Sequence, residues 1–102
     1  MSQIFNAINS NDLHKINFLV INKEIDINEI DDFGNTPLIY AIYKKKNDIA
    51  KLLIKNNANT EIKNKHGQNA LFYSILTDSI EIFNILTQVS HLKIEPDSLK
   101  IQ

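Results

Sequence analysis

The side chains that could act as acids, bases or metal ligands are scattered along this sequence. Its three histidines, His14, His66 and His91, never come three or four residues apart, the spacing that a local metal site on a helix requires. The chain has no cysteine, which excludes disulfides, thiolate metal sites and a cysteine nucleophile. Its two glycines are too few for a phosphate-binding loop. We therefore expect no enzymatic activity, no metal and no cofactor.

The charges argue against a nucleic-acid partner. The formal net charge is -1, and every basic residue is a lysine, so arginine's bidentate contacts to phosphate and guanine are absent. The one cluster, YKKKND at Tyr43–Asp48, has the composition of a solvated loop, and as a binding patch it would attract an acidic protein.

The sequence also argues against a membrane protein. It shows no secretory pattern at its start and no apolar run near the roughly 20 residues of a membrane span. We expect a cytoplasmic protein that binds neither nucleic acid nor membrane.

The elements that must position these side chains repeat along the chain. The stretch DDFGNTPLIYAI, Asp31–Ile42, is echoed by NKHGQNALFYSI, Asn64–Ile75, at an offset of 33 residues. The same offset relates Tyr40 to Tyr73 and continues into the apolar residues that follow. A fixed period of this length is typical of architectures in which similar units stack side by side.

Each unit is expected to be a turn followed by two helices. Gly34 and Gly67 permit the positive φ of a tight turn, and Thr36 and Asn69 are residue types that cap helix N-termini. Pro37 suits a first helical position. The buried face of the first helix should carry residues at i, i+3 and i+4, namely Leu38, Ala41 and Ile42 in one unit and Leu71, Ser74 and Ile75 in the next.

Residues 31–63 resemble the repeat of the ankyrin family, with Ile39 where that family usually has histidine. Residues 64–94 keep the apolar skeleton, with Asp78 in the glycine slot between the helices. The first segment resembles an amino-terminal ankyrin repeat with Asn11 in that slot. The family's signature positions are filled by Asp31, Gly34, Thr36, Pro37, Leu38, Ala41, Ile49, Leu52, Leu53, Ala58 and Asn59.

The resemblance implies an all-α ankyrin-repeat solenoid of helix-turn-helix pairs joined by β-turn or hairpin loops. The resemblance covers roughly residues 4–94, and we expect residues 1–102 to form a single domain. Repeat 1 is expected at about 1–30, repeat 2 at about 31–63 and repeat 3 at about 64–94, and a tail at 95–102 starts an incomplete fourth turn.

The last repeat is unusually apolar for the end of a solenoid. Terminal repeats normally carry polar residues on their outer side, but residues 80–94 show little such change. We expect part of this surface to be exposed and to be covered by a partner, a second copy or a continuation of the array. The apolar positions are Ile80, Ile82, Phe83, Ile85, Leu86, Val89, Leu92 and Ile94.

Ankyrin proteins usually bind partners across a concave face made by turn tips and first helices. Phe33 is the aromatic residue at an expected turn tip, where it could anchor a partner or pack against a neighbouring tip. The resemblance places the partner-binding positions at Asp32, Phe33, Asn35, Tyr43, Lys44, Lys65, His66, Gln68, Leu76 and Thr77, with Asn9 and Ser10 beside them.

Three functions are consistent with this pattern. The leading expectation is a non-enzymatic protein-protein interaction module that uses the concave surface. A small inhibitor or immunity-type protein that blocks a toxin or enzyme is the first alternative, and a structural fragment of a longer ankyrin array is the second. Self-association through the last repeat is a further alternative.

Overall fold

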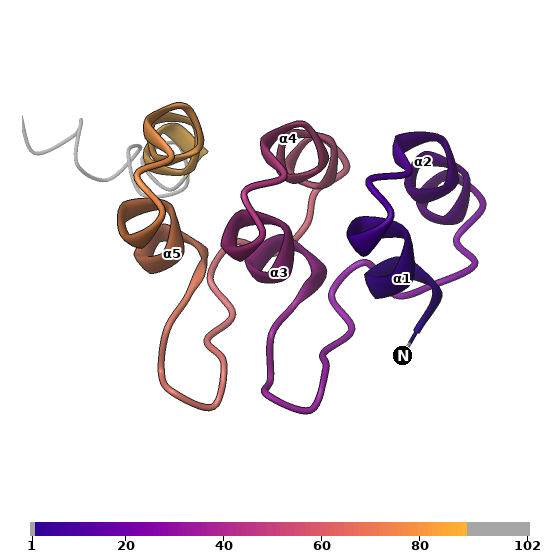
Figure 1. Cartoon of the computed structure of the whole chain (residues 1–102), viewed down its shortest axis with the longest axis horizontal. Helices are drawn as coiled ribbons and strands as arrows, with labels where there is room; N and C mark the ends of the chain where they lie inside the picture. The colour runs from indigo at the N-terminus through magenta and orange to yellow at the C-terminus, as the bar shows by residue number, and fades with distance from the viewer. Residues whose placement is uncertain (1, 90–102) are drawn as a thin grey trace, which may run out of the picture.

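The computed structural model describes residues 2–89, which form three pairs of helices standing in a row (Figure 1). The first helices of the pairs make one layer and the second helices make another, with long loops extending from the side of the first layer. The helices are α1 (Gln3–Asn9), α2 (Leu13–Ile21), α3 (Pro37–Tyr43), α4 (Asn47–Lys55), α5 (Ala70–Leu76) and a further helical segment at 80–89.

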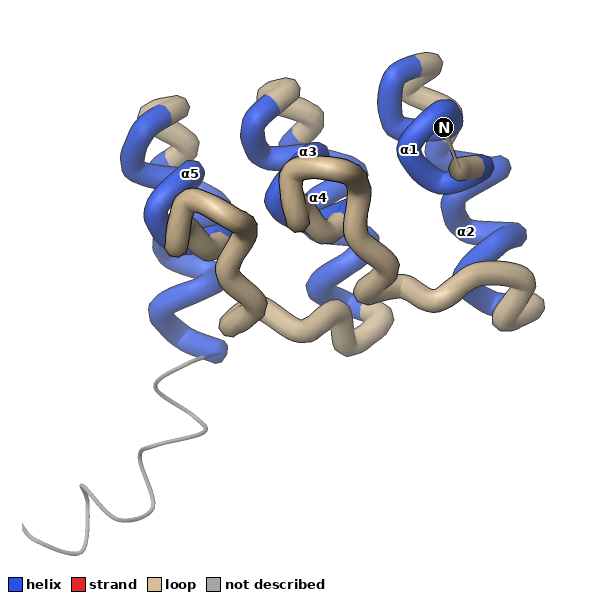
Figure 2. Tube along the Cα trace, turned by 90° about the horizontal axis from the view of Figure 1, so that it is seen from below, coloured by secondary structure: helices blue, strands red, loops and turns tan. Residues whose placement is uncertain are grey.

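Between residues 2 and 89 the structure contains helices and loops but no strand (Figure 2), which confirms the all-α solenoid. The connecting loops nevertheless close as hairpin turns. The backbone N–H of Asp31 donates to the carbonyl oxygen of Asn35 at 3.0 Å, and that of Asn64 donates to Gln68 at 2.9 Å.

The helix starts follow the capping residues that the sequence offered. The hydroxyl of Thr36 accepts a hydrogen bond from the backbone N–H of Ile39, and the amide oxygen of Asn69 accepts one from Phe72. Pro37 occupies the first turn of α3, where a missing N–H costs nothing. These caps satisfy backbone donors that the helix itself leaves unpaired, so they place both first helices in the same way.

The turns between paired helices depend on residues with positive φ. Asn11, Lys45 and Asp78 have φ of 56°, 60° and 57°, and they occupy equivalent places after α1, α3 and α5. In the loops between repeats, Gly34 and Gly67 have φ of 78° and 74°, as expected for tight turns. The glycine slots filled by Asn11 and Asp78 therefore keep the left-handed conformation even without glycine.

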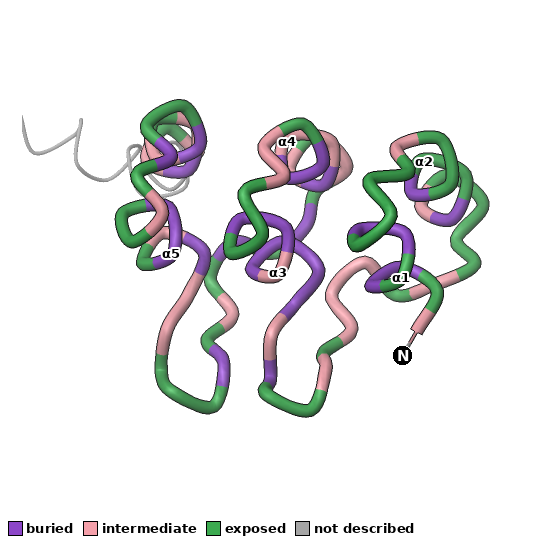
Figure 3. The backbone as a smooth tube through the Cα atoms, viewed as in Figure 1, coloured by how far each residue is buried: buried purple, intermediate pink, exposed green. Residues whose placement is uncertain are grey.

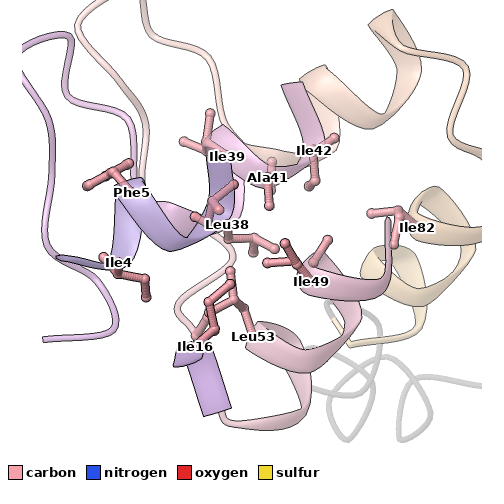
Figure 4. Close-up of a cluster of buried hydrophobic side chains, with 14 of the residues drawn as sticks. Ile4, Phe5, Ile16, Leu38, Ile39, Ala41, Ile42, Ile49, Leu53 and Ile82 are labelled. Carbon is pink, nitrogen blue, oxygen red and sulfur yellow. The ribbon is translucent and has the colours of Figure 1, made fainter. Parts of the chain in front are cut away.

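The core lies between the two helix layers and runs through all three pairs. Figure 4 shows Ile16 of α2, Leu38 of α3 and Ile49 and Leu53 of α4 pointing toward one another. All four are buried, and so is Ile39, which packs as a hydrophobic residue where ankyrin repeats usually have histidine. Stacking thus joins units that could not bury their apolar faces alone.

The expectation for α5, the first helix of repeat 3, was wrong at one position. Ile75 was placed on a buried face, but its side chain is 63% exposed, whereas the equivalent Ile42 is fully buried. The reason is that repeats 1 and 2 are each followed by another repeat, and the described residues contain nothing in that place beside α5. Figure 3 shows exposed residues on the side of α5 that faces away from α3.

The helical segment 80–89 divides as the sequence led us to expect. Ile82 and Leu86 are buried, Phe83, Ile85 and Val89 are half-buried, and Ile80 is exposed. Leu92, Ile94 and the tail at 95–102 lie outside the described residues.

A candidate protein-binding groove

A groove of about 720 Å³ runs along the side of the molecule formed by the loops and the first helices. It draws residues from all three repeats, so it exists only because the repeats stack. Six of its residues are predicted partner-binding positions, namely Asp32, Phe33, Asn35, Tyr43, Lys44 and His66. The others are Ser2, Phe5, Ile30, Asp31, Tyr40, Asn64 and Tyr73.

Aromatic rings supplied by successive first helices line the groove. Phe5 of α1 meets Tyr40 of α3 edge to face, with ring centroids 5.2 Å apart. Tyr43 of α3 meets Tyr73 of α5 in the same manner at 6.0 Å. Such contacts stabilise the rings in fixed orientations. The site prediction missed Phe5, Tyr40 and Tyr73, although the 33-residue match of the two tyrosines was a signal that could have found them.

Hydrogen bonds hold two of these tyrosines from their hydroxyl ends. The hydroxyl of Tyr40 donates to Oδ1 of Asn9 at 2.7 Å, which joins repeat 2 to repeat 1. The hydroxyl of Tyr73 donates to Oε1 of Gln68 at 2.6 Å and accepts from Nδ2 of Asn64 at 3.0 Å. Gln68, one of the predicted contact residues, is thus half-buried and positions Tyr73.

The turn beside the groove in repeat 2 is braced from within. Oδ1 of Asp31 accepts hydrogen bonds from the backbone N–H groups of Phe33 and Asn35, both at 2.9 Å. This arrangement leaves the side chain of Phe33 63% exposed at the tip while its backbone is held in place. Because the carbonyl oxygen of Phe33 also accepts from the backbone N–H of Lys65 at 3.0 Å, the tips of repeats 2 and 3 are joined.

Charged side chains of both signs line the groove. Asp32 stands on the turn, and Lys44 stands at the carboxyl end of α3. Nζ of Lys44 lies 5.5 Å from the ring centroid of Tyr40 and 5.9 Å from that of Tyr43, within the range of a cation-π interaction. A ligand in the groove would therefore meet carboxylate groups, an ammonium group and aromatic rings.

The remaining predicted positions do not line the groove. Lys65 is exposed on the turn of repeat 3, and Leu76 is exposed at the end of α5. The hydroxyl of Thr77, the residue that ends α5, donates to the carbonyl oxygen of Tyr73 at 2.8 Å. The hydroxyl of Ser10 likewise donates to the carbonyl oxygen of Asn6 at the end of α1, whereas Asn9 accepts the hydrogen bond from Tyr40 described above.

An exposed ion pair links repeats 2 and 3 in the layer of second helices. Nζ of Lys51 in α4 lies 3.1 Å from Oε2 of Glu81 and 3.6 Å from Oδ1 of Asp48. The hydrogen bond and the charge of Glu81 raise the pKa of Lys51.

Two features are absent from the part of the chain that the structure describes. Among residues 2–89, no three or more histidine, aspartate or glutamate side chains come together as a metal site would need. No helix in that part is long and apolar enough to cross a membrane. The expectations of no metal, no cofactor and no membrane partner remain predictions.

Comparison with known proteins identifies the family of this fold. A family model described as ankyrin repeats in three copies matches residues 4–98. A putative ankyrin repeat protein of Rickettsia bellii is 38% identical over 71 residues, which is 67% of this chain and 10% of that protein.

Solved structures agree with that match. A chain in the complex of the predatory endopeptidase Bd0816 from Bdellovibrio bacteriovorus with immunity protein Bd3460 is 32% identical, with a TM-score of 0.75. The match covers 86% of this chain and 46% of that one. The ankyrin repeat protein EF0377 is 31% identical, with a TM-score of 0.76 and coverage of 83% and 45%. The present chain thus spans less than half the length of each of these relatives.

Proposed function

This chain belongs to the ankyrin-repeat family, and we propose that it is a non-enzymatic module that binds a partner protein through the groove. Ankyrin repeats are protein-interaction modules, which supports the general class. We further propose that the repeats have the bounds expected from the sequence, at about 1–30, 31–63 and 64–94. We also propose a cytoplasmic location, with which the lack of cysteine is compatible.

The observation that carries the proposal is the exposed Phe33 beside a groove lined with fixed aromatic rings. Large aromatic side chains are enriched among the few residues that dominate binding energy. The rings of Tyr40 and Tyr73 are already held by hydrogen bonds and ring contacts, so a partner would spend little free energy on ordering them. Such a surface favours a protein ligand that inserts its own apolar side chain between the turn and the helices.

The test begins with a pull-down from the native source and measures the affinity of the captured partner. The double variant Phe33→Ala, Tyr43→Ala should weaken binding by about tenfold or more, which corresponds to about 1.4 kcal/mol. The matched control is Phe18→Ala, Ile21→Ala, because those α2 side chains are comparably exposed and lie outside the groove. Unchanged affinity in the groove variant would remove this surface from the interface.

An inhibitor or immunity-type role is the second candidate. It is supported by the 32% identity to a chain in a complex that contains an immunity protein and an endopeptidase. The discriminating experiment is co-purification with a toxic or degradative enzyme, followed by measurement of that enzyme's activity at increasing amounts of this chain. Stoichiometric inhibition that the groove variant loses would support this role, and a partner that retains full activity would exclude it.

A further inference from the structure

The side of repeat 3 that faces away from repeat 2 is built like an internal surface of the solenoid. We call the residues Ile75, Ile80 and Phe83 the carboxyl-terminal face. They line a hollow of about 230 Å³ together with Ser74 and Asp78. Ile75 and Ile80 are exposed and Phe83 is half-buried.

The positions in repeats 1 and 2 that correspond to Ile75 and Phe83 are buried, whereas those that correspond to Ile80, Leu13 and Asn47, are half-buried. Ile8 and Ile42 correspond to Ile75, and both are fully buried. Ile16 and Ala50 correspond to Phe83, and both are also fully buried. These residues are buried because a repeat follows each of them: α3 packs on α1, and α5 packs on α3. The carboxyl-terminal face therefore has the composition of a surface that another repeat covers.

The two glycine turns show the same asymmetry. A Cβ added at Gly34 would lie 3.0 Å from the backbone nitrogen of Lys65, because the next turn packs directly against it. A Cβ added at Gly67 would meet nothing within 4 Å. Gly67 thus keeps the open backbone of a turn beside which another turn can lie.

The opposite end of the solenoid differs in charge. Lys15 is exposed in α2 at the place that Ile49 and Ile82 occupy in the other second helices. Each lies four residues after an equivalent positive-φ residue, which fixes the register. Ile49 and Ile82 are fully buried, and Figure 4 shows Ile82 pointing back toward α4. The amino-terminal end thus replaces an apolar stacking residue with a charged one.

We propose that the carboxyl-terminal face docks a further ankyrin-type repeat, stacked in register, with an apolar side chain at the place of Ile49. The amino terminus of a second copy does not fit this requirement, because stacking it there would bury the Lys15 ammonium group in an apolar hollow. This inference does not depend on the groove or its partner.

The test extends the chain with one of its own repeats. In the extended chain, residues 1–96 are followed by a second copy of residues 31–63, so that the copied Asp31 takes the place of Asp97. Covering the carboxyl-terminal face should raise Tm by about 5 °C or more relative to the original chain. In the matched extension, the copied Ile49 is changed to lysine, and at least half of that rise should be lost. Equal Tm values for the original and extended chains, or equal gains in both extensions, would overturn the proposal.

Two further measurements test the face itself. Ile75→Lys should leave the Tm of the original chain within about 2 °C, since surface substitutions usually have small effects, but it should cancel the gain in the extended chain, where that position is expected to be buried as Ile42 is. Sedimentation of the original 102-residue chain should show a monomer. A dimer that Ile75→Glu, Ile80→Glu dissociates would mean that a second copy occupies this face, and it would overturn the proposal even if the extended chain failed to fold.

Discussion

Nδ2 of Asn64 donates a hydrogen bond to Oδ1 of Asn35 at 2.9 Å and so joins the turn of repeat 3 to that of repeat 2. Oδ1 of the same asparagine accepts from the backbone N–H groups of His66 and Gln68. One buried side chain thereby shapes its own turn and fixes the neighbouring one. The equivalent residue in repeat 2, Asp31, has acceptors but no donor.

Asn64→Asp should therefore destabilise the protein by about 1–3 kcal/mol, because it removes both donated bonds and leaves a buried carboxylate. Urea unfolding measures the loss. Asp31→Asn is the matched control, since it keeps an acceptor for Phe33 and Asn35 and should cost less. If the two variants lost equal stability, the bridging role of Asn64 would be wrong.

The two turn glycines should respond differently to alanine. Both have positive φ, so each substitution costs about 1–2 kcal/mol in backbone strain. Gly34→Ala must also push its Cβ against the backbone of Lys65, whereas Gly67→Ala meets open space. We expect a clearly larger drop in Tm for Gly34→Ala in calorimetry. A larger drop for Gly67→Ala would contradict the close approach of the two turns.

Ile42 and Ile75 offer a comparison of one position in two repeats. Ile42→Ala should cost about 2–5 kcal/mol, because it removes a fully buried side chain and leaves a cavity. Ile75→Ala should cost less than about 1 kcal/mol, because that side chain is mostly exposed. Chemical denaturation of both variants tests this, and similar losses would show that Ile75 is covered in solution.

The Lys51–Glu81 pair gives a prediction about pH. Because Glu81 raises the pKa of Lys51 above 10.5, the pair's contribution to stability is fully present at neutral pH and is lost only as the pH rises through that raised value. Glu81→Gln should bring the pKa of Lys51 back toward 10.5 in an NMR titration. Its Tm at pH 7 should change little, since the pair is exposed. An unshifted titration in the variant would show that the pair does not form in solution.

Local and periodic signals were sufficient to predict the repeating architecture. The caps at Thr36 and Asn69 and the positive φ of Gly34 and Gly67 depend on a few neighbouring residues, so the sequence alone predicts them. The 33-residue period extends these local features into a stack. Its physical basis is that a unit with one unburied apolar face is stable only against a similar neighbour.

Exposure and the shape of the groove were decided by the tertiary structure. Ile42 and Ile75 carry the same side chain in the same local pattern, but one is buried and the other exposed, because burial depends on whether a repeat follows. Tyr40 and Tyr73 become groove residues, and Gln68 becomes a residue that holds Tyr73, only when the repeats stack. The sequence by itself determined the repeating unit, and the stacking of those units decided which side chains remain available for binding.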